Sequence, residues 1–170
     1  MQSDERPLLN HLPSEFLTWL WWISERDGGN LNLGPELGTI LVYVDDRIAF
    51  RGLEDEKPRA VLTGENASNT LEARAALAGG RVVKELRLAI KREEREYSVV
   101  LKGLYLDIAG AKLPGLVKGA VEEVLYDRMY LLEELSFIEA GLLQRFARER
   151  TSPAWREDSL PAMRAWVSGD

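Results

Sequence analysis

The feature of this sequence that most restricts its fold is a pair of alternating segments in the middle of the chain. In segment 82–92, most apolar residues share one parity and most charged residues share the other: Val82, Leu86, Leu88 and Ile90 against Val83, Glu85, Arg87, Ala89 and Lys91. Segment 97–102 repeats the alternation, and Glu93-Glu94-Arg95 between them is predicted to be a turn. A period of two is typical of strands with one buried face. We therefore expect residues 82–102 to form an antiparallel hairpin over a hydrophobic core.

Further strands are predicted on both sides of this hairpin. Segments 39–44 and 47–51 are rich in β-branched and apolar residues, and Asp45-Asp46 between them is predicted to be a tight turn. Segments 59–63 and 104–108 have the same character. Their connections are too short for crossover helices, so the strands should be antiparallel. The sequence predicts an α+β fold in which helices pack an antiparallel sheet of about five or six strands.

Two shorter helices are predicted around these strands. The first, 14–26, begins after Pro13 and ends at Asp27-Gly28-Gly29-Asn30, and its apolar residues cover almost the whole circumference. Such a helix is normally buried or used as a contact surface; a base-stacking platform is the weaker alternative, because the nearest cation is Arg26. The second helix, 66–78, is expected to end at Gly79-Gly80.

A long C-terminal helix is predicted over 117–150, with a length of roughly 50 Å if it is unbroken. Its stripe repeats at steps of four and three: Val121, Val124, Arg128, Leu131, Leu135, Ile138 and Leu142. We expect this helix to break, most readily at Gly141, or to project beyond the sheet. Packing over its own sheet and pairing as a coiled coil or dimer both remain open.

The chain divides into three predicted parts. Residues 1–13 form an N-terminal arm, residues 14–150 a single α+β domain, and residues 151–170 a tail in which Trp155 and Trp166 are expected to dock on a surface. The first ten residues have no apolar signal region, and the apolar stretch 16–23 is far shorter than the roughly 20 residues that span a bilayer. These features predict a soluble, cytoplasmic protein without a membrane partner.

Composition and motifs argue against catalysis. The chain has no Cys and one His, His11, which excludes thiolate chemistry and metal sites with two imidazoles. It contains no phosphate-binding or hydrolase motif of the common kinds. Asp45-Asp46 with Glu54 is the candidate set for a magnesium-dependent nuclease, but turn and loop roles suit these residues better. We predict that the protein is not an enzyme and holds no cofactor or metal.

Basic residues concentrate on the central hairpin, although the formal net charge is −6. Six cations fall within fifteen residues: Arg81, Lys84, Arg87, Lys91, Arg92 and Arg95. Arg87 and Lys91 share the solvent parity at a spacing of roughly 13 Å, about two phosphate steps along one strand. This strip could follow a nucleic-acid backbone. The alternative is an ordinary solvated face, because glutamates at positions 85, 93, 94 and 96 lie among the cations.

The same region resembles a known family. A run of ten residues, together with the helix before it and the hairpin after it, resembles the C-terminal half of RdgC, the recombination-associated protein. The run is Gly79-Gly80-Arg81-Val82-Val83-Lys84-Glu85-Leu86-Arg87-Leu88. Segments 15–21 and 121–146 look like the helices that open and close that half, so the resemblance spans residues 14–147. Arg81 matches the family's basic residue after the glycine. Lys84-Glu85 stands where the family tends to have Thr-Lys, which moves the cation one position earlier.

The resemblance implies sequence-nonspecific binding of double-stranded DNA, a ring-shaped dimer with a positively lined hole, and restraint of RecA-type recombination. The N-terminal half of the family's proteins, which helps to close the ring, is expected to be missing from this chain. We expect a non-catalytic DNA-binding protein of recombination or replication that contacts phosphates through Arg81, Lys84, Arg87, Lys91 and Arg92. The alternative is an interaction or scaffold subunit that uses Trp-rich surfaces without binding DNA. A second copy or a protein partner is expected to contact the Trp-rich helix, the long helix or the tail.

Overall fold

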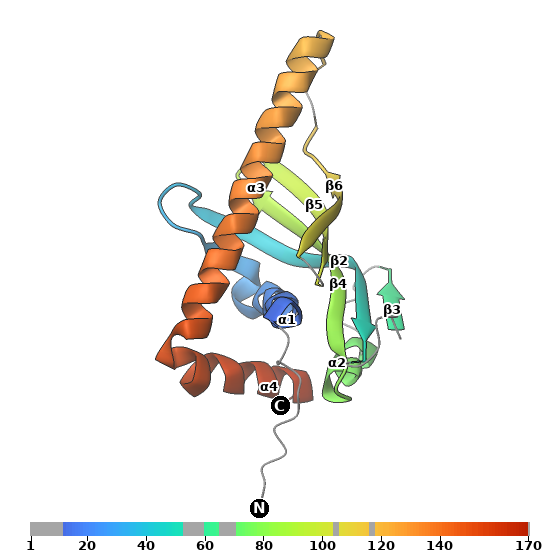
Figure 1. Ribbon diagram of the computed structural model, residues 1–170, viewed down its shortest axis with the longest axis vertical. Helices are drawn as coiled ribbons and strands as arrows, with labels where there is room; N and C mark the ends of the chain where they lie inside the picture. Colours follow the sequence, from blue (N-terminus) through green and yellow to red (C-terminus); the bar gives the residue numbers. More distant parts are fainter. Residues whose placement is uncertain (1–11, 53–59, 65–70, 104–105, 116–117, 170) are drawn as a thin grey trace, which may run out of the picture.

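The computed structural model shows an α+β fold in which helices pack a six-stranded antiparallel sheet (Figure 1). It describes residues 12–52, 60–64, 71–103, 106–115 and 118–169; His11 and Glu54 lie outside these residues. The strand order is β1-β2-β4-β5-β6, with β3 paired to β2. The strands are β1 (Asn30–Asn32), β2 (Thr39–Arg51), β3 (Ala60–Thr63), β4 (Val82–Arg92), β5 (Arg95–Lys102) and β6 (Asp107–Lys112).

The central hairpin forms as the alternation predicts. Strand β4 has the predicted bounds, and it pairs with β5 from Glu85↔Lys102 to Arg92↔Arg95 around a turn at Glu93-Glu94. Its inward residues Leu86, Leu88 and Ile90 are buried in the core. Strand β6 begins three residues later than predicted and extends to Lys112, whereas Leu104 lies outside the described residues.

The predicted turn at Asp45-Asp46 is wrong, because β2 runs through it as one strand. Val44 pairs with Leu88 and Ile48 with Leu86, so three residues of β2 lie opposite one residue of β4 in a bulge. Asp46 has partners within the bulge. Its carboxylate lies 3.3 Å from the Arg87 guanidinium, and its backbone carbonyl accepts a hydrogen bond from the Gly64 N–H. The apolar residues on either side keep pairing with β4, which favours a continuous strand.

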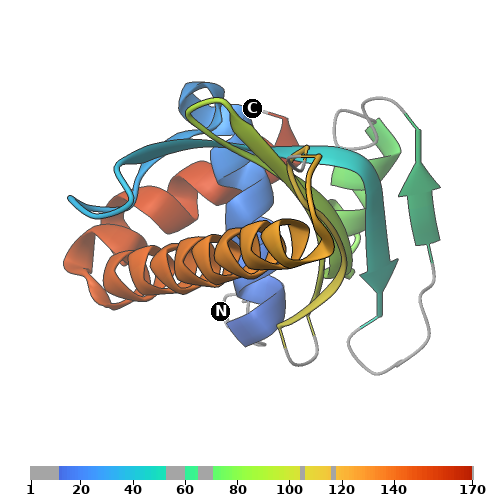
Figure 2. The ribbon, with the colours of Figure 1, turned by 90° about the horizontal axis from the view of Figure 1, so that it is seen from above.

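Helix α1 (Leu12–Glu25) forms the centre of the core, and the curved sheet wraps around it (Figure 2). It begins two residues before the predicted start, so Leu12 and Pro13 belong to the helix and not to an arm. Trp19 and Trp21 are fully buried and Trp22 is nearly so. A short turn, η1 (Arg26–Gly29), in which Asp27, Gly28 and Gly29 all have positive φ, follows and leads the chain into β1, a strand that was not predicted.

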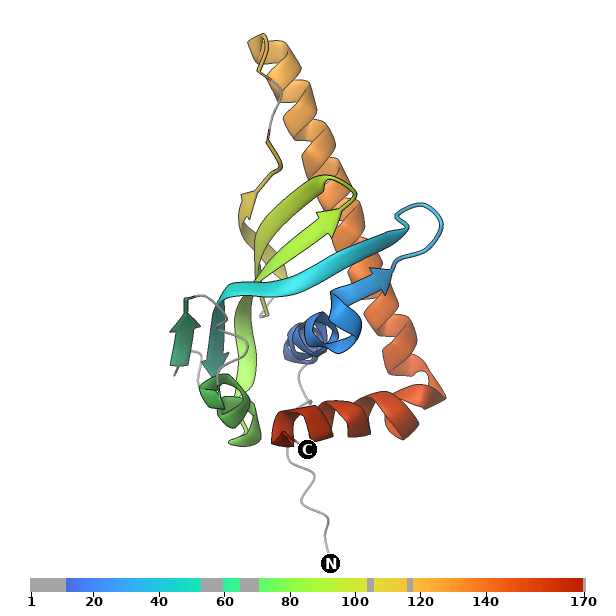
Figure 3. The same ribbon diagram turned by 180° about the vertical axis from the view of Figure 1, so that it is seen from behind.

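The C-terminal tail docks as expected, on the side of α1 away from the sheet (Figure 3). It consists of η3 (Trp155–Ser159) and α4 (Leu160–Ser168). Trp155 is buried edge-on against Phe146, and Trp166 meets Trp21 edge-on at 4.8 Å. Glu25 of α1 accepts hydrogen bonds from the indole N–H groups of Trp21 and Trp166.

Helix α2 (Leu71–Ala78) also packs at this end of the molecule. The predicted residues 66–70 lie outside the described ones, and the helix ends at Gly79-Gly80 as expected, with Gly80 at φ 85°. Arg74 of α2 forms an ion pair with Glu25 at 2.9 Å. The Glu25 carboxylate therefore joins α1, α2 and α4.

Helix α3 (Val121–Thr151) is unbroken over 31 residues, about 46 Å, and its first half projects past the sheet (Figure 1). Of the two predicted alternatives, a break at Gly141 does not occur and the projection does. A Cβ at Gly141 would lie 2.9 Å from Leu37 Cδ1 and 3.2 Å from Leu33 Cδ1. The glycine therefore lets the β1–β2 loop approach the helix closely.

Candidate interaction surfaces

The cations of the predicted DNA-binding strip do not form one continuous basic surface. Arg87 forms an ion pair with Asp46 at the β2 bulge. Arg92 turns toward α3, where its Nη1 lies 3.1 Å from Glu134 Oε2 and its Nε donates to the Leu37 carbonyl. Both guanidiniums thus bind groups of the same chain.

The other three predicted residues are spread along β4. Arg81 precedes the strand, Lys84 lies at a bulge where the β2–β4 register shifts, and Lys91 is exposed near the far end. Ten residues of strand separate Arg81 from Lys91, about 33 Å. Within the described part of the chain no ion pair joins Arg81 or Lys91. On the outer face between them, Glu85 pairs with Arg47 and Glu96 accepts the Tyr43 hydroxyl hydrogen bond.

The tryptophan rings do not form the expected partner surfaces. Trp19, Trp21, Trp22 and Trp155 are all buried within the chain. Trp166 is partly buried, and both its ring and its N–H are engaged by α1. These side chains were predicted to be either core or contact surface; four of them are core, and Trp166 packs against the core while partly exposed.

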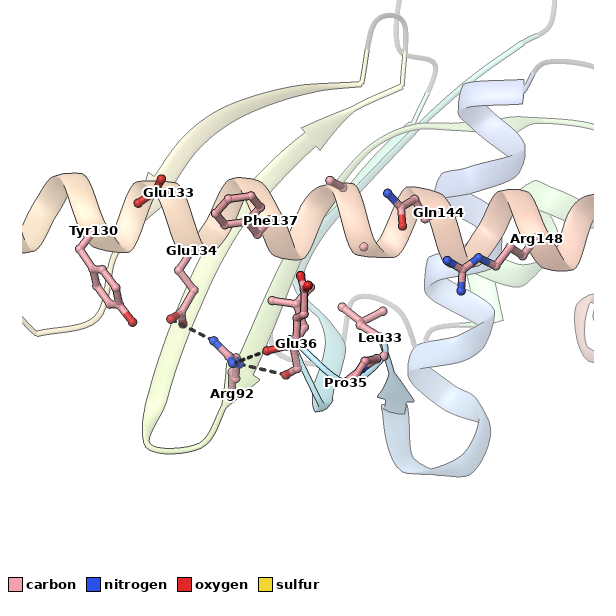
Figure 4. Close-up of a pocket in the computed structure, with 14 residues that line it drawn as sticks. Leu33, Pro35, Glu36, Arg92, Tyr130, Glu133, Glu134, Phe137, Gln144 and Arg148 are labelled. Carbon is pink, nitrogen blue, oxygen red and sulfur yellow. Dashed lines mark hydrogen bonds and ion pairs between the residues drawn. The ribbon is translucent and has the colours of Figure 1, made fainter.

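A buried carboxylate, Glu134, joins α3 to the tip of the β4–β5 hairpin (Figure 4). Its Oε1 accepts a 2.8 Å hydrogen bond from the Tyr97 hydroxyl, and its Oε2 lies 2.9 Å from Arg95 Nη2 as well as near Arg92. Burial, followed by the bond to Glu134, raises the pKa of Tyr97 above its ordinary range. This cluster was not predicted. The sequence gives one indication of it, because Glu134 is an acidic residue next to Leu135 of the predicted apolar stripe.

Most of the exposed large apolar side chains of the described structure belong to α3. The residues Val121 to Tyr130 have no buried member, and burial begins at Leu131. Tyr126 is 71% exposed and Phe137 59% exposed. We call the following set the apolar α3 surface: Val121, Leu125, Tyr126, Met129, Tyr130, Leu132 and Phe137. Single exposed apolar residues are ordinary, whereas a contiguous group on one element is typical of an interaction site.

A groove of about 480 Å³ runs beside this surface, between α3 and the β1–β2 loop (Figure 4). Leu33, Pro35 and Leu37 of the loop form one wall. Phe137, Ala140 and Gln144 of α3 form the other, with Arg148 at one end and Tyr130 at the opposite end. The Arg92–Glu134 ion pair closes the bottom, since Arg92 also binds the carbonyls of Glu36 and Leu37. Through Arg92, the Glu134 carboxylate therefore links the two walls of the groove.

The described residues hold no cluster of three or more acidic, histidine or cysteine side chains that could bind a metal ion. None of the described helices is both long enough and apolar enough to cross a membrane. No protein-family model, curated protein or solved structure showed significant similarity to the chain. The RdgC resemblance therefore stays a hypothesis that rests on the sequence alone.

Proposed function

We propose that this is a non-catalytic interaction protein that self-associates through the apolar α3 surface. The observation that carries the proposal is the projecting first half of α3, where residues 121–130 include no buried side chain and large apolar ones are exposed within the described structure. A helix with so little tertiary packing gains stability when another surface covers it.

The size of the surface suits a second copy of the chain. Fully burying an aromatic side chain covers on the order of 150–250 Å², and three of the seven residues are aromatic. With the four aliphatic side chains and the polar residues around them, they can supply much of the roughly 800 Å² per partner of a standard interface. The surface also carries charges of both signs within a short distance, with Asp127 and Arg128 between its apolar residues. Mixed charge next to apolar area allows self-complementary pairing, in which the same surface serves both partners.

The test is the oligomeric state of the intact chain. We expect a mass of twice 19.2 kDa in light scattering after gel filtration at micromolar concentration. The variant Leu125→Lys/Tyr126→Lys/Met129→Lys should run as a monomer with unchanged circular dichroism, because none of the three side chains is buried. The matched control Val61→Lys/Leu71→Lys removes exposed apolar residues on other elements and should stay dimeric. A monomeric wild type, or a triple variant that still dimerises, would refute the proposal.

Nonspecific DNA binding is a second proposal, and a cluster of basic residues at one end of the sheet favours it. Arg51 pairs in register with Val82, which places the backbones of Arg51 and Arg81 side by side, and Lys84 follows close along β4. Within the described residues, neither Arg51 nor Arg81 is recorded in an ion pair. Cations without carboxylate partners are available to phosphates.

This second proposal predicts weak, salt-sensitive binding to duplex DNA. Substituting Arg51→Ala/Arg81→Ala should lower the dependence of log affinity on log salt by about 2 between about 50 and 200 mM salt. Fluorescence anisotropy with a labelled duplex measures it, and Lys118→Ala/Arg164→Ala, two exposed cations on other elements, is the matched control. No binding at the lowest salt would exclude this function and leave self-association untouched.

A further inference from the structure

We infer that the groove between α3 and the β1–β2 loop binds the first half of α3 from a second copy, in antiparallel orientation. The inference rests on the self-association proposed above and specifies which surfaces meet. Each chain then inserts the first half of its α3 into the groove of the other chain, so the pair contains the same contact twice.

Charge complementarity sets the antiparallel direction. The free end of α3 begins with Glu122 and Glu123, both exposed, and the groove ends at the exposed Arg148. Among the described residues, Arg148 forms no ion pair, unlike Arg150, which binds Glu15 at 2.9 Å. A parallel pair would place the glutamates of the two copies together, which is unfavourable, whereas an antiparallel pair places Glu122 near Arg148.

The side chains along the helix agree with this register. In an antiparallel pair the numbers of facing residues have a constant sum, so Glu122 opposite Arg148 puts Tyr126 opposite Gln144. The same register puts Tyr130 opposite Ala140, whose small side chain leaves room in the groove wall. Tyr126, Tyr130, Phe137, Ala140 and Gln144 follow one another at steps of four, seven, three and four, and therefore lie on one face of α3.

Length and symmetry are also consistent with a closed pair. The unpacked segment Val121–Tyr130 is about 15 Å long, and the groove follows α3 from Tyr130 to Arg148, about 27 Å. A twofold axis near residue 135 fills both grooves at once, so the contact closes at two chains. The free end points away from α1 and α4, which places these helices of the two chains at opposite ends of the pair (Figure 1).

Disulfide trapping tests the register without background, because the chain has no cysteine. Tyr126→Cys and Gln144→Cys proteins are prepared separately, mixed and oxidised, and the products are separated without reductant. We expect the mixture to form crosslinked dimer at least about tenfold faster than either protein alone, because facing sulfurs react when they come close. Rapid crosslinking of Tyr126→Cys with itself would instead indicate a parallel pair and overturn the inference.

Charge reversal gives an independent measurement. Arg148→Glu should raise the dimer dissociation constant at least about tenfold, and adding Glu122→Lys to the same chain should restore it to within about threefold. Arg156→Glu, an exposed arginine outside α3, is the matched control and should change little. A dimer that shows neither the crosslink nor the rescue overturns this inference but leaves self-association standing, whereas a monomeric wild type removes both.

Discussion

Replacing Glu134 by alanine is expected to lower the free energy of unfolding by about 3 kcal/mol, the lower end of the range for breaking a buried ion pair. The carboxylate is 5% exposed, accepts a hydrogen bond from the Tyr97 hydroxyl and forms ion pairs with Arg92 and Arg95. Without it, a buried hydroxyl loses its acceptor and two guanidiniums that face the interior lose their counter-charge. The two arginines keep some contact with water, which limits the loss.

Urea unfolding followed by fluorescence measures this change, and the neighbouring residue supplies the control. Glu133→Ala removes a carboxylate of the same charge from an exposed position on the same turn and should change stability by less than about 0.5 kcal/mol. Glu134→Gln keeps an acceptor for Tyr97 but removes the charge, so its loss should fall between the two. Equal losses for the Glu133 and Glu134 variants would contradict the structural role given to the cluster.

The Glu134 cluster also connects stability with the proposed assembly. Arg92 binds the carbonyls of the β1–β2 loop on one side and Glu134 on the other, so one carboxylate holds both walls of the groove. Glu134→Ala should therefore weaken self-association more than Glu133→Ala does. Light scattering on the folded variants at low temperature separates this effect from unfolding.

Elements governed by local sequence were the ones that the sequence predicted well. Strand β4 has the predicted bounds because its alternation is regular from Glu85 to Leu88 and because Gly79-Gly80 before it and the Glu93-Glu94 turn after it limit its length, although a bulge at Lys84 also buries Val83. Helix α1 was predicted within a few residues, since a proline starts it and glycines follow it. In these segments, short-range patterns and packing favour the same structure.

Elements that depend on distant residues were not predicted. Asp45-Asp46 has the composition of a turn, but Arg87 and Gly64 supply partners that keep β2 continuous, and neither partner is visible from the local sequence. A glycine such as Gly141 often marks a helix break, yet here the glycine leaves room for the close approach of Leu33 and Leu37 to the helix. Both errors come from interpreting a local signal without its tertiary partner.

The candidate site was predicted only in part, for the same reason. The long helix was expected to project or pair, and its first half does project. The basic strip was expected to be one surface, but the side chain of Arg92 crosses to α3 and that of Arg87 returns to β2. Strand parity says which face a residue lies on, whereas the ion pairs that long side chains form depend on the neighbouring elements.

Replacing Gly29 by alanine is expected to lower the free energy of unfolding by about 4 kcal/mol. The residue has φ 75°, a left-handed conformation that raises the energy of an alanine by roughly 1–2 kcal/mol. In addition, its Cβ would overlap the carbonyl oxygen of Val42 in the central strand β2. Relief of this overlap requires a backbone shift, which adds about 1–3 kcal/mol.

Gly28 provides a matched control for this prediction, since it is the preceding residue and has a similar φ of 64°. A Cβ there would meet only Asn30 Nδ2, at 3.6 Å, so Gly28→Ala should lose about 1 kcal/mol from backbone strain alone. The difference between the two variants in urea unfolding isolates the close approach to Val42. If the variants lost equal stability, backbone conformation would be sufficient, and the packing of the α1–β1 connection on β2 would contribute nothing. A larger loss at Gly29 would mean that the close packing of the α1–β1 connection on β2 requires a residue without a Cβ at this position.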